Sequence, residues 1–261
     1  DAVHPYEEKY TNPDGSLKWA DKWSGSRDGM DDFYEAFHNF AQLYSLGGGD
    51  HLLEMAERHW DGITQQLTGY GRIHKEYERG YDQFHQSESY IYFYHNCLAD
   101  PGNDVLMDRA RRFAGFYLNE DPDAPNYDPE HRIIRAPHNG SAGPAWGMSD
   151  DDSALSYNPG ASMLVYGLPL TDVPGISRVE DLQNPDKARA MGKAMAERFR
   201  EGDVGNNLNV NGLIMNAYLM TGDDKYRSWL LEYTEGWLER ARDNNGIMPD
   251  NVGLDGKVGT L

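Results

Sequence analysis

Hydrophobic residues recur at three- and four-residue steps through much of the chain, which indicates amphipathic helices. In the first such run, Met30, Phe33, Phe37 and Phe40 share one face, and Gly47 follows its end. Asp50 then stands at an N-cap position before the next run. The same pattern predicts helices over residues 28–46, 51–67, 84–99, 104–118, 185–201, 207–221 and 224–243.

Three segments lack this periodicity. Residues 1–27 form an N-terminal arm with Pro5, Pro13 and Gly15, and residues 119–183 are a long insertion dense in Pro, Gly and Asp. Residues 246–261 have the composition of a loop. The sequence therefore predicts an all-α fold with one domain over residues 28–261, interrupted by an irregular insertion at about 119–183.

A helical hairpin recurs along the chain. The stretches LYSLGGGDHLLEMAERHW, NCLADPGNDVLMDRARRF and YLMTGDDKYRSWLLEYTEGW each contain an apolar helix end, a Gly/Asp break and a charged amphipathic helix. Repeated helical pairs of this kind bury their apolar faces against one another. We therefore expect the first helix of each hairpin to lie in an inner ring and the charged second helix in an outer ring.

The predicted inner helices begin with polar residues, in the stretches RDGMDDFYE, GYDQFHQSESY and GNNLNVNG. If their N-termini lie on one rim, the polar stripes meet in one cleft, where helix dipoles stabilise carboxylates or bound anions. Acids in a first helical turn also simply complement the dipole, at about 0.3–1 kcal/mol each. The shared pattern favours a polar cleft.

Composition excludes several classes of partner. The formal charge of −19 opposes binding to nucleic acid or to an anionic membrane surface. No apolar run reaches the roughly 20 residues that span a bilayer. Cys97 is the single cysteine, so an internal disulfide or a Cys-rich metal site is excluded, and we expect it in the core. A strongly acidic chain suits a secreted protein, and we expect an extracellular or periplasmic location.

The hairpin joints, such as LMTGDDKY, resemble those of α/α-toroid carbohydrate-active enzymes, which include unsaturated glucuronyl hydrolases, polysaccharide lyases and some glycoside hydrolases. The resemblance is architectural and covers roughly residues 28–118 and 185–250. It implies helical hairpins forming part of an (α/α)-barrel and a carbohydrate substrate. A closed toroid of this type has more helices than the seven predicted here, so we expect a further chain segment or subunit to complete the ring, with this chain as the N-terminal part of a larger catalytic domain.

Glycoside hydrolysis requires two carboxyl groups about 5–5.5 Å apart for retention or about 6.5–9.5 Å apart for inversion. Asp31 on the first inner helix and Glu88 on the second are our candidate pair, with His85 as a third catalytic residue. The candidate substrate-binding residues line the same predicted cleft: Arg27, Asp28, Asp32, Glu35, His38, Tyr81, Tyr92, His95, Asn207 and Asn211.

Two other functions remain open at this point. A polysaccharide lyase acting on a uronate-containing glycan would use His85 or Tyr92 as the base that removes a proton beside the carboxylate. A helical array could instead bind a glycan or a protein without chemistry. Loss of Asp31 or Glu88 would abolish turnover in an enzyme, whereas in a binding protein it would at most weaken binding.

The sequence predicts no cofactor. A structural Ca²⁺ is the one metal that the residues suggest, because Asp121, Asp123 and Asp128 supply the oxygen ligands that this ion prefers. The spacing of an EF-hand is absent, and a solvated acidic loop explains the same composition.

Overall fold

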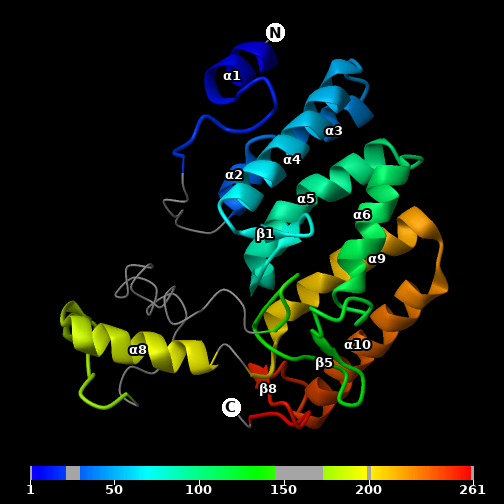
Figure 1. Ribbon diagram of the computed structural model, residues 1–261. Helices are drawn as coiled ribbons and strands as arrows, with labels where there is room; N and C mark the ends of the chain where they lie inside the picture. The colour runs from blue at the N-terminus through cyan, green and yellow to red at the C-terminus, as the bar shows by residue number, and fades with distance from the viewer. Residues whose placement is uncertain (1, 22–29, 145–172, 199–200, 260–261) are drawn as a thin grey trace.

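The computed structural model describes residues 2–21, 30–144, 173–198 and 201–259, and this part of the chain is mostly helical (Figure 1). Its helices are α1 (Val3–Tyr10), α2 (Asp31–Glu35), α3 (Asn39–Ser45), α4 (His51–Gly69), α5 (Gln83–Ala99), α6 (Asp104–Gly115), α8 (Pro185–Arg198), α9 (Val210–Thr221) and α10 (Asp224–Asp243), with 3₁₀ turns η2 (Val179–Gln183) and η3 (Gly205–Asn209). The predicted all-helical class is therefore confirmed at this coarse level.

The described strands form short antiparallel pairs in the segments between the helices. The pairs are β1 (Ile73–His74) with β2 (Tyr77–Glu78), β3 (Tyr81–Asp82) with β6 (His138–Asn139), β4 (Tyr127–Asp128) with β5 (Ile133–Ile134), and β7 (Asp203–Val204) with β8 (Asn251–Val252). In the β3–β6 pair, Asp82 lies opposite His138. Through this pairing, part of the predicted insertion lies beside the N-terminal end of α5.

The helices pack in the alternation that the hairpins predict. Helices α2 and α3 contact α5, and α5 contacts α9, so these helices form one row. Helix α4 packs on α3, while α6 and α10 both pack on α9 (Figure 1). Helix α8 packs on η2 and stands apart from this body in Figure 1. The described helices form no closed barrel.

Some predicted boundaries were wrong. The first predicted helix is broken after Glu35 into α2 and α3, and the N-terminal arm contains the helix α1. The described parts of the insertion and the tail contribute β4, β5, β6 and β8 rather than only loops. These strands are two residues long, too short to leave a two-residue periodicity in the sequence.

The core is aromatic. Trp60 of α4 stacks on Tyr34 of α2 at a ring-centroid distance of 4.7 Å, and Tyr92 and Phe93 of α5 lie against the same indole. All four side chains are buried. Cys97 is also buried, as predicted. The rich tyrosine content therefore serves largely as core packing.

The N-terminal arm docks closely on α4. A Cβ added at Gly62 would lie 2.4 Å from the backbone of Gly15 and Ser16, so only glycine allows this approach. Gly15 has a φ of +90°, a conformation that other residues rarely adopt. In the part of the chain that is described, none of the helices combines the length and the apolar character needed to cross a membrane.

Candidate functional site

Three carboxyl groups meet where α2 passes the first turns of α5. Asp31 and Glu35 come from the two ends of α2, and Glu88 comes from α5. One oxygen of each lies within 4.8 Å of the other two. Asp31 is 3% exposed, and its Oδ1 has no hydrogen-bond partner among the described residues. We call Asp31, Glu35 and Glu88 the acidic trio.

Asp31 differs from an ordinary surface aspartate in its ionisation. Burial raises its pKa to about 7, and the negative charges of Asp32 and Glu88 act in the same direction, whereas the charge of His85 opposes them. Because a buried carboxylate loses its hydration, burial favours the neutral, protonated form of the group. Asp31 is therefore half protonated near neutral pH.

Asp82 and His85 form an ion pair next to the trio. Asp82 is the N-cap of α5, and its Oδ1 accepts hydrogen bonds from the backbone N–H groups of Phe84 and His85. Its Oδ2 lies 2.7 Å from Nδ1 of His85. Burial alone would lower the pKa of His85, but the hydrogen bond and charge of Asp82, with the charges of Asp31 and Glu88, raise it to about 9. His85 is therefore an imidazolium at neutral pH.

Two further titratable groups sit behind this pair. Burial raises the pKa of Glu78 in β2 to about 8, and Asp31 and Asp82 are among the charges that raise it. Burial lowers the pKa of His138 in β6 to about 4, so His138 is neutral at pH 7. Its ring lies 5.2 Å from that of Tyr81, which also contacts His85 at 5.2 Å. The site thus holds protonated acids, a cation and a neutral imidazole together.

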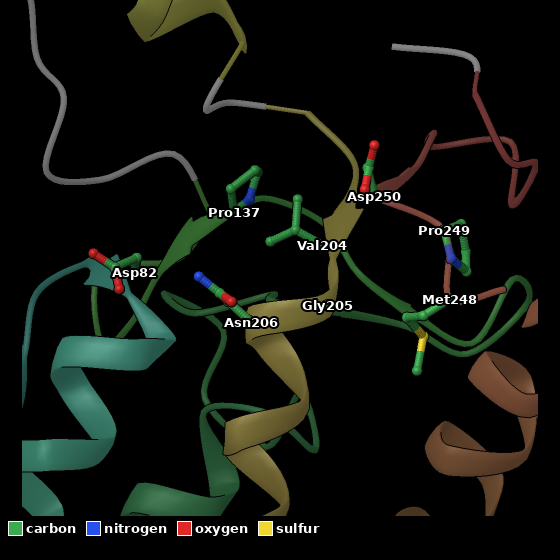
Figure 2. Close-up of a pocket in the computed structure, with 8 residues that line it drawn as sticks. All are labelled: Asp82, Pro137, Val204, Gly205, Asn206, Met248, Pro249 and Asp250. Carbon is green, nitrogen blue, oxygen red and sulfur yellow. The ribbon is translucent and has the colours of Figure 1, made fainter. Parts of the chain in front are cut away.

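A pocket of about 430 Å³ opens beside Asp82. Figure 2 shows Asp82 and Asn206 on one side and the segment from Met248 to Asp250 on the other. Asp82 comes from the start of α5 and Asn206 from η3, which precedes α9. The starts of two helices of the same row therefore share one hollow, as the polar helix starts predict.

The structure brings several predicted site residues together and separates others. Asp31, Glu35, Glu88 and His85 form one cluster. Asp32 is exposed beside them. Arg27 and Asp28 lie outside the described residues. Tyr81 is buried against His85 rather than presented to solvent.

The deeper members of the predicted stripes do not reach the cleft. Tyr92 is fully buried and donates to the backbone oxygen of Ala56 at 2.5 Å, so its predicted role in stacking on a substrate was wrong. His95 and His38 contact each other instead, with Nδ1 of His95 2.8 Å from the His38 backbone oxygen. A helix rises about 1.5 Å per residue, so seven residues carry Tyr92 about 10 Å further along α5 than His85.

The two asparagines of the third predicted inner helix serve the scaffold. Asn207 is fully buried, donates to Asp203 at 2.8 Å and accepts from Asn139 at 3.0 Å. Asn211 donates to Thr234 of α10 at 3.3 Å. Direct substrate contact by the buried Asn207 was therefore a wrong prediction, although Asn206, next to it, lines the pocket, whereas Asn211 is half-buried and does not appear in that lining.

The three calcium candidates have protein partners. The Lys75 ammonium lies 2.6 Å from Asp121 and 3.0 Å from Asp123, between the two carboxylates where a cation would bind. Asp128 instead pairs with His131 at 3.0 Å. Among the described acidic and histidine side chains, those close enough to share a metal ion are the acidic trio. Its oxygen ligands suit a hard divalent cation.

Sequence reasoning missed Asp82, Glu78 and Asp250. Asp82 carries a readable signal, because an aspartate directly before a helical run is a favoured N-cap, and His85 follows three residues later. Glu78 and Asp250 reach the site through strand pairs or loops that no local pattern indicates.

A family model described as "Domain of unknown function (DUF8034)" matches residues 1–261. The chain belongs to this family. No curated protein and no solved structure matches it.

The site of this DUF8034 chain holds groups with complementary chemical properties. A carboxyl group that is half protonated near pH 7 can donate a proton, and a second carboxylate within 4.8 Å can act as nucleophile or base. An imidazolium beside them stabilises negative charge. A pocket of about 300–1,000 Å³ is the usual size for a small organic ligand, and the hollow beside Asp82 falls in this range.

Proposed function

We propose that this DUF8034 chain is a glycoside hydrolase in which Asp31 donates the proton and Glu88 is the second carboxylate. The observation that carries the proposal is the placement of Asp31, whose pKa is raised to about 7 by burial, within 4.8 Å of the oxygens of Glu88 and Glu35. Two carboxyl groups in unlike environments, one protonated and one ionised, are what glycosidic cleavage requires.

The close approach of Asp31 and Glu88 favours cleavage with retention of configuration. Retaining enzymes hold their two carboxyl groups about 5–5.5 Å apart, whereas inverting enzymes need about 6.5–9.5 Å to admit a water molecule. Glu88 would then attack the anomeric carbon while Asp31 protonates the leaving oxygen. Water would release the sugar from Glu88 in the second step, with Asp31 now accepting the proton of that water.

His85 and Glu35 support these roles. The imidazolium of His85 attracts the carboxylate of Glu88, whose charge is among those that raise the pKa of His85. Glu35 lies within 4.8 Å of Asp31 and Glu88, while the negative charges of Asp32 and Glu88 favour the protonated form of Asp31. Asp82 holds His85 in place through the hydrogen bond to Nδ1.

The pocket beside Asp82 suits a neutral sugar. Asp82, Asp250 and Asn206 offer oxygen acceptors for hydroxyl groups, and Pro137, Val204 and Met248 supply apolar surface for a sugar ring. A uronate carboxylate would be repelled by the aspartates of this lining. We therefore propose a neutral polysaccharide or oligosaccharide as the substrate class.

The lyase alternative finds less support in the same geometry. A base must be unprotonated, whereas the pKa of His85 is raised to about 9 by its pairing with Asp82, in spite of burial. Tyr92 is fully buried, and burial raises the pKa of its phenol well above the usual value. Neither of the two candidate bases is therefore in the state that elimination requires.

The experiment that tests the proposal is a substrate panel with matched variants. Neutral and uronate-containing polysaccharides are incubated with the protein, and hydrolysis is followed by reducing-sugar release, while elimination is followed by absorbance of an unsaturated product. On the substrate so found, Asp31→Asn and Glu88→Gln should abolish reducing-sugar release while glycan binding persists. Full activity in both variants, or an unsaturated product, would overturn the assignment. Binding without cleavage by the wild-type protein would show a carbohydrate-binding module instead.

A further inference from the structure

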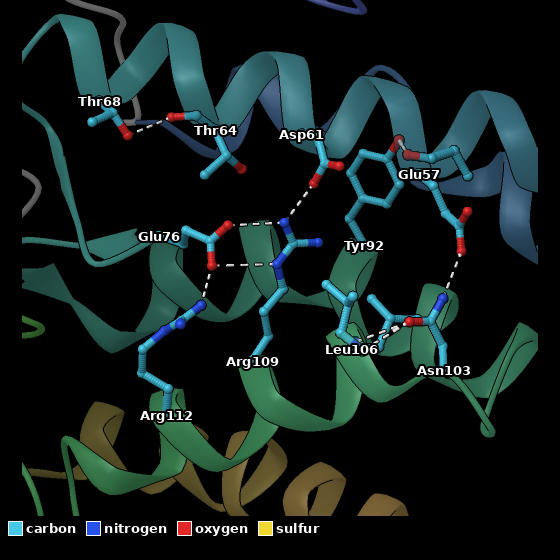
Figure 3. A network of polar contacts seen from close by, with 12 residues as sticks. Glu57, Asp61, Thr64, Thr68, Glu76, Tyr92, Asn103, Leu106, Arg109 and Arg112 are labelled. Carbon is cyan, nitrogen blue, oxygen red and sulfur yellow. Dashed lines mark hydrogen bonds and ion pairs between the residues drawn. The ribbon is translucent and has the colours of Figure 1, made fainter.

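A second pocket lies between α4, α5 and α6, away from the acidic trio. Its volume is about 150 Å³, and its lining includes Glu57 and Trp60 of α4, Asn96 of α5 and Leu106 of α6. We call it the α4–α6 pocket. Figure 3 shows its charged side, where Arg109 lies between Asp61 and Glu76 and where Asn103 reaches Glu57.

Two buried polar side chains on this lining have unsatisfied hydrogen-bonding groups. Asn96 is 0% exposed, and neither Oδ1 nor Nδ2 has a partner in the part of the chain that the structure describes. Trp60 is also 0% exposed, and its indole N–H likewise meets no acceptor among the described residues. Because both atoms of the Asn96 amide lack partners, exchanging its oxygen and nitrogen would not remove the deficit.

Leaving such groups unpaired is energetically costly. Each buried polar group without a partner costs about 1–3 kcal/mol, so folded proteins almost always satisfy them. Asn96 and Trp60 come from different helices and line the same hollow. A single occupant that accepts hydrogen bonds from the indole N–H and the amide NH₂, and donates one to the amide oxygen, would satisfy all three groups. A hydroxyl group can do both.

The charges of the lining select a neutral occupant. The positive charge of Arg109 is matched by Asp61 at 2.7 Å and Glu76 at 2.8 Å. Glu57 accepts from Asn103 at 3.3 Å and opposes an anion. Val105 and Leu106 add apolar surface to the same lining. An amphipathic lining of this kind matches the apolar face and hydroxyl edge of a polyol better than it matches water alone.

We propose that the α4–α6 pocket binds one small neutral polyhydroxylated molecule, of the size of glycerol or a single sugar unit, through Asn96 and the Trp60 indole N–H. Two residues of the lining are largely exposed to solvent, Val105 at 59% and the side chain of Asp61 at 58%. Its volume of about 150 Å³ is well above the roughly 10–15 Å³ that a cavity needs to hold one water molecule, which leaves space for a larger molecule.

The test uses the indole N–H resonance of Trp60 as a reporter. The chain has six tryptophans, and Trp60→Phe assigns the signal. Among the residues that the structure describes, no tryptophan lines the pocket beside Asp82, so the Trp60 signal separates this pocket from the proposed catalytic site. ¹⁵N-labelled protein is titrated with glycerol and, separately, with methyl α-glucoside. The expected result is a saturable shift of this resonance with at least one of the two probes.

Matched variants complete the test. Asn96→Leu removes the amide but keeps its approximate volume, and should abolish the shift while leaving the protein folded, because no polar partner is orphaned. Asn216→Leu replaces another buried helical asparagine, which bonds to Cys97 and does not line the pocket, and should retain the shift. The absence of a saturable shift in the wild-type protein, as expected for a pocket that holds only water, would overturn the proposal. An undiminished shift in Asn96→Leu would overturn it as well.

Discussion

Asp82 binds His85 twice, through the backbone and through the side chain. Its Oδ1 accepts from the backbone N–H of His85 at 3.2 Å, and its Oδ2 lies 2.7 Å from Nδ1 of the same residue. One carboxylate thus caps α5 and fixes the charge of the imidazole beside the acidic trio. The Asp82 side chain therefore both caps the start of α5 and sets the charge of the His85 imidazole.

The first prediction separates these two tasks. Asp82→Asn keeps an N-cap of similar quality but removes the negative charge, whereas Asp82→Ala removes both. In Asp82→Asn the pKa of His85 should fall from about 9 toward its ordinary value of 6.5, because the hydrogen bond and charge that offset burial are weakened. NMR titration of the imidazole measures this, with the resonances of His131, which pairs with the unaltered Asp128, as internal control. Asp82→Ala should lose about 1 kcal/mol more stability than Asp82→Asn.

The ion pair of Asp82 and His85 should stabilise the fold fully only within a limited range of pH. The pKa of His85 is higher in the folded chain than in the unfolded chain, so its contribution to stability is complete below pH 6.5 and is lost as the pH rises through about 9. The pKa of Asp82 is lowered, despite burial, by its bonds to His85, so its contribution is lost as the pH falls below about 4. Denaturant unfolding of the wild-type protein and of His85→Gln should therefore differ most between pH 4 and 6.5. Equal differences at pH 6 and pH 10 would contradict this account.

The second prediction concerns Asp203, a carboxylate whose pKa is raised in the fold, whereas the pKa of Asp82 is lowered. Asp203 is fully buried in β7, where burial raises its pKa to about 7 although Asn207, Ile134 and Tyr233 donate hydrogen bonds to it. A raised pKa means that the folded chain binds the proton more tightly, so stability is highest below pH 3.8 and falls until about pH 7.

In Asp203→Asn this fall should be absent. The free energy of unfolding of Asp203→Asn minus that of the wild type should increase by up to about 4 kcal/mol from pH 4 to pH 8. Urea unfolding at a series of pH values measures it. Asp186→Asn, an exposed carboxylate on α8, is the control and should leave the wild-type pH dependence unchanged. A parallel pH dependence in Asp203→Asn and wild type would show that Asp203 stays ionised in the fold.

The sequence predicts the helices better than the site because the two depend on different kinds of information. Residues such as Phe37 and Trp60 fall on apolar faces that repeat within a window of several residues, so local periodicity finds their helices. The convergence of Asp31 and Glu88 also follows, because Asp31 begins α2 and Glu88 lies near the start of the neighbouring α5. Tyr92 was misplaced because a shared face does not fix the depth along α5.

Other parts of the site depend on contacts between distant segments. His138 reaches Asp82 through the β3–β6 pair, whose strands are two residues long and 56 positions apart. Asp250 reaches the pocket beside β8, which pairs with β7. Such short strands carry no pattern of their own, and their partners are set by the packing of the helices that they connect.

The third prediction concerns the docking of the N-terminal arm on α4. A Cβ at Gly62 would lie 2.4 Å from Ser16 N and 2.5 Å from Asp14 O, and backbone atoms cannot give way as side chains do. Gly62→Ala should therefore destabilise the protein by about 1–3 kcal/mol, the usual cost of overpacking, despite the better helix propensity of alanine. Thermal unfolding and protease sensitivity of the arm measure it.

Gly69→Ala is the matched control for this change. Gly69 ends the same helix, and no described atom lies within 4 Å of an added Cβ. Because the methyl group meets no obstacle there, the variant should be as stable as wild type or more stable by up to about 1 kcal/mol. If both glycine variants behave alike, the close contact between the arm and α4 does not form in solution.

The final prediction follows from the state of Asp31. If Asp31 is the proton donor, activity on the substrate identified by the panel should fall as the pH rises through about 7, where this carboxyl ionises. Asp31→Asn and Glu88→Gln should each lower kcat by about 10²–10⁴-fold, the usual contribution of such groups. Asp104→Asn and Glu54→Gln, exposed acids in the first turns of α6 and α4, are the controls and should keep wild-type activity.

Glu88→Ala distinguishes a nucleophile from a general base. In a retaining enzyme the small side chain leaves space for azide, which can replace the lost carboxylate, attack the anomeric carbon and leave as a glycosyl azide of inverted configuration. Partial recovery of leaving-group release from an activated glycoside with azide, together with that product by NMR, would therefore support Glu88 as nucleophile. Inversion at the anomeric carbon in the wild-type product would refute the role of Glu88 as nucleophile. Oxygens of Asp31 and Glu88 lie within 4.8 Å of each other, a separation that favours retention.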